Sequence, residues 1–317
     1  MTFPLPLRYA GGMNAKTIIS ASRRTDLPAY YMDWFLGRLR DGYAISRNPM
    51  NPNQARRVSL LPDDVRCVVF WSKNPAPLLT RLDALSPYAH YLQYTLNAYG
   101  RDIEPGMPSH SARVGVFSRL ADALGAERVR WRYDPILFAP AYGPAYHVEA
   151  FARTARALRG YTRCVTVSFL DLYAKIHKNV KTLSLRRPDE AEAASLLKRF
   201  AQIAGENGLS LRTCAEAVDY GALGIGRGRC IDPALIGALT GEAMPLQRDK
   251  NQRPACGCAP SVDIGMYHTC PHGCAYCYAN FSQSAALRAR ARHDPAAPSL
   301  FRHQDKGESI SSPGIFA

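Results

Sequence analysis

The sequence predicts an α/β fold, a full or partial parallel (β/α) barrel, on three observations. Short apolar segments alternate with amphipathic helical segments along most of the chain. Polar or charged residues follow the apolar segments, as they do at the ligand-binding edge of a parallel sheet. The length of 317 residues suits one barrel with extensions, and the sequence shows no repeat of fixed period of the kind that would indicate a solenoid.

The first strand and helix are predicted near the N-terminus. Residues 17–22 form a short apolar strand, and Arg23 and Arg24 follow it. Asp26 is placed to cap a helix that continues to Gly42. Two arginines beside the free N–H groups of a helix start favour a bound carboxylate or phosphate, and the alternative is a structural arginine–aspartate pair.

The next two strands also end in polar residues. The segment 67–71 is strongly apolar and leads directly into Lys73 and Asn74. A third strand is predicted at 90–97 and ends at Asn97. Because the carboxyl ends of parallel strands meet at one edge, we expect these side chains to lie at the same mouth as the two arginines.

The middle of the chain continues the alternation. A strand at 129–138 carries Arg132 and Asp134, and charges in so apolar a strand are expected to point into a polar barrel interior. Helices are predicted around it at 114–124 and 144–158. The remaining elements are strands at 164–170, 209–213 and 261–269 and a helix at 188–205 that begins with acidic residues.

The strongest chemical signal is a group of three cysteines that follows the last predicted strand. Cys270, Cys274 and Cys277, with Tyr276 before the last, have the spacing C-x3-C-x-Y-C. Three thiolates can hold three corners of a [4Fe–4S] cluster and leave the fourth iron open to another ligand. Zinc also takes thiolate ligands, so the spacing by itself leaves the metal undecided.

This motif resembles the signature of the radical S-adenosylmethionine (SAM) enzymes. The resemblance implies that the three cysteines hold a [4Fe–4S] cluster, which binds SAM and cleaves it reductively to a 5′-deoxyadenosyl radical. It also implies that Tyr276 packs near the adenine of SAM and that an electron donor such as flavodoxin or ferredoxin reduces the cluster. In these enzymes the motif usually follows the first barrel strand, so its position here predicts a circularly permuted barrel with a C-terminal cluster loop.

More narrowly, the chain resembles an uncharacterised bacterial family with this motif at its C-terminal end, DUF1848. The segments that carry this resemblance are 22–26, 70–75, 132–135 and 256–280.

The resemblance also suggests roles for the polar residues at the barrel mouth. The cations, which are Arg23, Arg24, Lys73 and Arg132, are candidates for the SAM carboxylate or an anionic substrate. Ser168 and Asp171 are candidates for the ribose hydroxyls, with pairing of Asp171 to Lys175 as the alternative. Asp134 and Glu216 are candidate polar anchors in the lumen, and Asn74 is a further candidate cofactor contact.

Four more cysteines lie upstream of the motif: Cys214, Cys230, Cys256 and Cys258. Four thiols are the number that a closed [4Fe–4S] cluster needs, so they are candidates for an auxiliary cluster. A structural zinc and unligated thiols are the alternatives, because cysteine spacing does not choose among them. Cys67 and Cys164 lie inside apolar strands and are interpreted as core residues.

Composition limits the remaining choices. Lys and Arg total 40 against 26 Asp and Glu, a net charge of +14, which favours an anionic substrate such as nucleic acid, a nucleotide or a phosphorylated metabolite. An ordinary basic surface explains the charge equally well. The sequence contains no long apolar segment, so we expect a cytoplasmic protein without membrane contact.

We therefore predict a radical SAM-type iron–sulfur enzyme. The barrel spans residues 17–280, with a cysteine-rich part at 214–280, between an extension at 1–16 and a basic helix with a flexible tail at 281–317. A zinc-stabilised nucleic-acid-binding protein without catalysis is the first alternative, and an iron–sulfur electron carrier is the second.

Overall fold

The centre of the protein is an eight-stranded sheet in which every pair of neighbours is parallel. The computed structural model describes residues 16–51, 53–171, 176, 180–280, 282–301 and 309–311. The sheet order is β10-β1-β4-β5-β6-β7-β8-β9. These strands are β1 (Thr17–Ala21), β4 (Val65–Ser72), β5 (His90–Thr95), β6 (Val129–Ile136), β7 (Cys164–Phe169), β8 (Ser210–Thr213), β9 (Gly226–Arg227) and β10 (Val262–Asp263).

Within the described residues β9 and β10 form the two edges of this sheet and do not pair with each other. The fold is therefore a partial barrel. The last strand in sequence, β10, pairs with the first, β1, through Ile19–Val262 and Ser20–Asp263. Because the cysteine motif comes late in the sequence, the last strand was predicted to lie beside the first, and this pairing agrees with that prediction.

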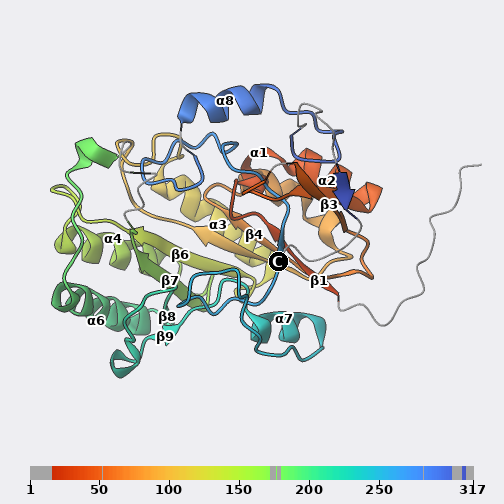
Figure 1. Cartoon of the computed structure of the whole chain (residues 1–317). Coiled ribbons are helices and arrows are strands. Elements are labelled where there is room, and N and C mark those ends of the chain that lie inside the picture. Colours follow the sequence, from red (N-terminus) through yellow and green to blue (C-terminus); the bar gives the residue numbers. More distant parts are fainter. Residues whose placement is uncertain are drawn as a thin grey trace, which may run out of the picture.

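Helices alternate with these strands (Figure 1). In the view of Figure 1, α8 lies above the sheet and α7 below it. The α-helices are α1 (Leu27–Tyr30), α2 (Met32–Asp41), α3 (His110–Leu124), α4 (Pro144–Ala157), α6 (Glu190–Glu206), α7 (Pro233–Thr240) and α8 (Gln283–Ala291). Short 3-10 helices are η1 (Ala76–Leu85), η2 (Lys181–Leu183) and η3 (Gly221–Leu223).

A second, three-stranded sheet was not predicted from the sequence. Its strands are β2 (Tyr43–Arg47), β3 (Gln54–Ser59) and β11 (Ser309–Ser311). β3 is central, because β2 pairs with it antiparallel and β11 pairs with it parallel.

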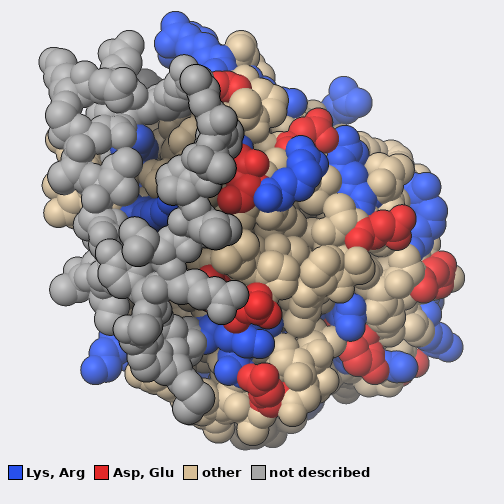
Figure 2. Space-filling view, turned by 90° about the vertical axis from the view of Figure 1, so that its right-hand side faces the viewer, with Lys and Arg blue, Asp and Glu red and all other residues tan. Residues whose placement is uncertain are grey.

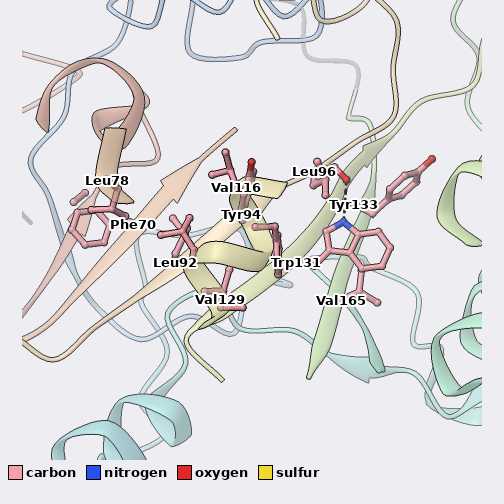
Figure 3. Close-up of a cluster of buried hydrophobic side chains, with 14 of the residues drawn as sticks. Phe70, Leu78, Leu92, Tyr94, Leu96, Val116, Val129, Trp131, Tyr133 and Val165 are labelled. Atoms are coloured by element: carbon pink, nitrogen blue, oxygen red, sulfur yellow. Dashed lines mark hydrogen bonds between the residues drawn. The ribbon is translucent and has the colours of Figure 1, made fainter. Parts of the chain in front are cut away.

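One face of the large sheet forms the main hydrophobic core with the helices. Figure 3 shows Phe70, Leu92, Tyr94, Trp131 and Val165 on this face, from four neighbouring strands. The indole N–H of Trp131 donates to the carbonyl of Leu96 at 3.0 Å, so the largest ring in this cluster leaves no buried donor unsatisfied.

The opposite face of the sheet is covered by the segment 214–260, which includes α7. Ile18, Val69 and Tyr91 pack there against Leu235 and Ile236. Arg132 and Asp134 point to this same face, because side chains alternate along β6 and Trp131 and Tyr133 occupy the helix side. The prediction that these charges point inward is therefore confirmed, although much of the face they point to is apolar.

Three predicted elements differ from the structure. The helix after Asp26 is interrupted at Tyr31, so α1 and α2 are separate, although the Asp26 and Gly42 caps are as predicted. The strand at 261–269 is only two residues long, because the carboxylate of Asp263 accepts a bond from the N–H of Gly265 and turns the chain.

The third difference concerns the segment after the basic helix, which was predicted to be a flexible tail. The described part folds back onto α2, where the indole of Trp34 donates to the carbonyl of Ala297 at 2.8 Å and Arg38 donates to Ala296 at 3.1 Å. Leu300 is fully buried in the main core. Of the proposed extension at 1–16, residues 1–15 lie outside the described residues. No helix in the described part of the chain is long and apolar enough to cross a membrane.

Candidate functional site

The cysteine loop begins where Asp263 ties the last strand to the first. The Asp263 carboxylate accepts hydrogen bonds from the hydroxyls of Ser20 and Ser22, both at 2.7 Å, and from the N–H of Arg23 at 2.8 Å. The N–H of Gly265 donates to it as well. One carboxylate thus joins the end of β1 to the start of the loop, and the cysteines emerge at the carboxyl edge of the sheet.

His272, inside the motif, is held by two residues of the α1 region. Its Nε2 lies 2.7 Å from the Asp26 carboxylate and its Nδ1 lies 2.9 Å from the Tyr30 hydroxyl. Asp26 also accepts from the backbone N–H of Lys73. Burial by itself would raise the pKa of Asp26, but the hydrogen bonds from His272 and from that N–H hold it below its usual value. The histidine therefore anchors the loop to the first βα unit.

Tyr276 is anchored from the other side by a buried carboxylate. Glu104 is almost inaccessible to water, and its carboxylate accepts from the Tyr276 hydroxyl, from Lys73 at 2.7 Å and from Arg113 at 3.3 Å. Asn97 donates at 3.2 Å to Oε1, the carboxylate oxygen that also accepts from Lys73 and Tyr276. Burial would raise the pKa of Glu104, but the charges of Lys73 and Arg113 lower it to about 2. Glu104 is therefore an anion that positions both Lys73 and Tyr276.

The three motif thiols lie within each other's electrostatic field. Cys274 is buried, and Cys270 and Cys277 are half-buried. Burial raises the pKa of Cys274 to about 12, although Lys73 opposes the rise. Such thiols stay protonated at neutral pH until a metal cation displaces the proton. Among the described residues, no three His, Cys, Asp or Glu side chains are already arranged at ligand distances around one point.

The other four cysteines come together on the inner face of the sheet, which is the face covered by the segment 214–260. The Cys214 and Cys230 sulfurs are 3.5 Å apart, and the N–H of Cys230 donates to the Cys258 sulfur at 3.2 Å. The neighbouring Cys258 thiol lowers the pKa of Cys256 to about 7. All four thiols are buried. The structure therefore brings together the whole set that was predicted to hold a second metal centre, although the four come from separate parts of the chain.

Arg132 connects this second set to the polar interior. It donates to the Cys230 sulfur at 2.7 Å and pairs with Asp134, which in turn accepts from the Ser168 hydroxyl. Burial would lower the pKa of Arg132, but Cys230 and Asp134 hold it well above its usual value. Ser168 is thus committed to Asp134 in this structure.

Arg23 and Arg24 both approach Asp263 and not Asp26. Arg23 lies over the Trp71 ring at 5.3 Å and donates to the Ser261 hydroxyl. Burial would lower its pKa, but the field of Cys258, Asp263 and Cys230 raises it. Arg24 lies 4.0 Å from Asp263 and donates to the carbonyl of Arg47 at 3.3 Å.

The remaining candidates lie around the rim. Asn74 is half-buried, and its N–H donates to Ser72 at 3.0 Å. Glu216 accepts from the N–H of Phe169 at 2.9 Å, and burial raises the pKa of Glu216.

Asp171 pairs at the surface with Arg187 at 3.1 Å and with Arg253. Its proposed partner Lys175 lies outside the described residues.

A family comparison covers almost all of these groups. The family model described as "Domain of unknown function (DUF1848)" matches residues 18–279. The chain belongs to this family. The matched span includes both cysteine sets and every other candidate residue named above. No curated protein and no solved structure matches the chain.

Sequence reasoning missed the two carboxylates that organise the site. Glu104 lies in a loop with neither a strand nor a recurrent motif around it, and Asp263 was assigned to the interior of a longer strand. His272 was left without a definite role, and Asp26 was expected only to cap a helix.

Proposed function

We propose that this protein is a radical SAM-type iron–sulfur enzyme. The observation that carries the proposal is the position of the C-x3-C-x-Y-C loop. It lies at the carboxyl edge of a parallel sheet, beside β1, and both of its flanks are fixed by buried carboxylates. Ligand sites of parallel α/β folds are built at this edge.

The residues present fit a cluster with one open iron. Cys270, Cys274 and Cys277 provide three sulfur donors, whereas His272 is occupied by Asp26 and Tyr30. A cubane held by three thiolates keeps its fourth iron free for an exogenous ligand. The donor set is therefore incomplete in the way that a cluster that binds SAM requires.

The chain's own side chains orient and shield this centre. A reduced cluster with SAM bound supplies a 5′-deoxyadenosyl radical, which is hard chemistry that no side chain performs. The Glu104–Lys73–Tyr276 group fixes the ring of the motif tyrosine beside the thiols. Lys73 places a partly buried positive charge next to Cys274, which stabilises thiolate ligands and an added carboxylate.

The substrate that these residues favour is anionic. Arg23 and Arg132 lie near the second cysteine set and Lys73 near the first, so positive charge lies beside both. On the face drawn in Figure 2, Lys and Arg are interspersed with Asp and Glu over the described residues. These features therefore agree better with binding of a small phosphorylated compound or a nucleotide than with nucleic acid bound along a continuous basic surface on this face.

The proposal is tested by anaerobic reconstitution and a 5′-deoxyadenosine assay with dithionite. The wild-type protein is expected to release 5′-deoxyadenosine, and Cys274→Ala is expected to abolish release because the cluster loses a ligand. Cys164→Ala is the matched control, since Cys164 is a buried thiol within β7. Wild-type rates in Cys274→Ala contradict the proposal. A colourless protein with salt-dependent nucleic-acid binding supports the non-catalytic alternative.

A further inference from the structure

The four cysteines on the inner face form a compact group that the activity proposed above does not use. Cys214 follows β8, Cys230 follows β9, and Cys256 and Cys258 precede β10. The sulfurs of Cys214 and Cys230 are in contact, the N–H of Cys230 donates to the Cys258 sulfur, and Cys256 is two residues from Cys258. Buried free thiols are usually scattered through a core, so convergence of four from three segments indicates a shared ligand.

The sulfur spacing distinguishes between two kinds of metal centre. Tetrahedral zinc with bonds of about 2.3 Å separates its sulfur ligands by about 3.8 Å. In a cubane each thiolate binds a different iron, so the width of the cluster holds the sulfurs further apart. The Cys214 and Cys230 sulfurs are 3.5 Å apart, a hydrogen-bond distance that is closer to the spacing of ligands around one ion than to that around a cubane.

The surroundings stabilise negatively charged sulfur. Two backbone N–H groups, from Cys230 and Ile231, point at the Cys258 sulfur at 3.2 and 3.5 Å. The guanidinium of Arg132 donates to the Cys230 sulfur at 2.7 Å. Four thiolates around a divalent ion carry a net charge of −2, and hydrogen bonds of this kind are the outer contacts that tune metal–thiolate centres.

We propose that Cys214, Cys230, Cys256 and Cys258 bind a single zinc ion as a structural tetrathiolate site. Because no three of these described thiols already surround one point, their side chains must rotate to complete the site as the metal binds. The site joins the ends of β8 and β9 to the segment before β10. It therefore fastens the covering segment 214–260 across the inner face and holds Arg132 in place.

The experiment measures metal content with the motif cysteines removed. The variant C270A/C274A/C277A, purified with zinc in the medium, is expected to retain about one zinc per chain and no iron. Adding Cys230→Ser should remove that zinc, whereas adding Cys164→Ser, the matched control, should leave it. The triple variant lacks the proposed SAM cluster, so the result is independent of the enzyme assignment.

Two results overturn the zinc proposal. About four iron atoms with acid-labile sulfide in the triple variant would show a cluster in the second site. A folded triple variant without metal would show unligated thiols. If the triple variant does not fold, zinc X-ray absorption of the wild-type protein replaces it. Four sulfur neighbours at about 2.3 Å are expected, and nitrogen or oxygen neighbours, or no bound zinc, would contradict the proposal.

Discussion

At the scale of single residues, Glu104 matters most to the site. It is fully buried between Lys73 and Arg113 and accepts from Tyr276 as well. Removing one partner of a buried ion pair leaves the other charge uncompensated, which costs more than a surface pair contributes. Glu104 therefore couples the stability of the fold to the position of the cysteine loop.

The substitution Glu104→Gln is expected to lower the free energy of unfolding by about 3 to 5 kcal/mol. Glu242→Gln is the matched control, because Glu242 is about half exposed in its pair with Arg66. That variant should lose no more than about 1 kcal/mol. Urea denaturation monitored by circular dichroism measures both. Equal losses in the two variants would mean that the Glu104 network does not stabilise the fold.

His147 is a second residue with a definite physical consequence. It is fully buried, with Nδ1 2.8 Å from the Tyr133 hydroxyl and Nε2 2.8 Å from the Leu137 carbonyl. Burial lowers the pKa of His147 to about 4. The unfolded chain takes up this proton as pH falls below about 6.5, but the folded chain does so only near its lower pKa.

The contribution of His147 to the free energy of unfolding is therefore fully present above the pKa that this histidine has in the unfolded chain. It is lost as pH falls toward the pKa that it has in the folded chain. Between pH 7.5 and pH 5 the loss should be about 2 kcal/mol. His147→Gln removes the titration, so the stability advantage of the wild-type protein over this variant should shrink by that amount. Urea denaturation at the two pH values measures the difference, and an advantage that does not change with pH would refute the assignment.

At the scale of elements, the sequence predicted the ends of helices better than the ends of strands. The helix α6 has the capping box of Asp189 and Glu192 that its acidic start suggested, and α3 ends at Gly125 as predicted. By contrast, the length of β10 was wrong, because a side chain from a distant part of the chain, Ser20, shares the Asp263 carboxylate that turns it. Caps are local, whereas strand ends depend on the neighbouring strand.

The tail after α8 is a tertiary feature with its own prediction. Leu300 is buried against the core although its surroundings in the sequence are rich in Pro and Ser. Leu300→Ala should lower the free energy of unfolding by about 2 to 5 kcal/mol. Leu287→Ala on α8, where the side chain is 51% exposed, is the matched control and should have little effect. Similar thermal unfolding of the two variants would contradict the packing of the tail.

At the scale of the whole molecule, a separate segment covers the inner face of the half-open sheet. The hydroxyl of Tyr91 and the amide of Gln93 both donate to the Cys230 carbonyl, at 2.7 and 2.8 Å. These bonds and the cysteine group attach the segment 214–260 to β5. The rest of the sheet is held by the helix-side core, so the two faces should respond independently to a local change.

Hydrogen exchange measured by mass spectrometry tests this independence. Cys230→Ser should speed amide exchange within residues 214–260 and leave β4 to β7 unchanged, because only the inner cover loses its attachment. Cys164→Ser, the matched control, should change exchange neither within residues 214–260 nor within β4 to β7. Acceleration across the whole sheet would show that the inner cover and the main core unfold as one unit.

The sequence by itself determined the parallel α/β class, most strand and helix positions, the polar inner face of β6 and the cysteine groups. These features depend on periodicity, end signals and the spacing of nearby residues, which are local properties of the chain. The tertiary structure alone decided that Glu104 and Asp26 hold the loop through Tyr276 and His272, and that four thiols from three segments meet. The two contacts that hold the loop join residues more than one hundred positions apart. Such contacts depend on how the strands are ordered, and that order is a property of the packed sheet and not of any segment.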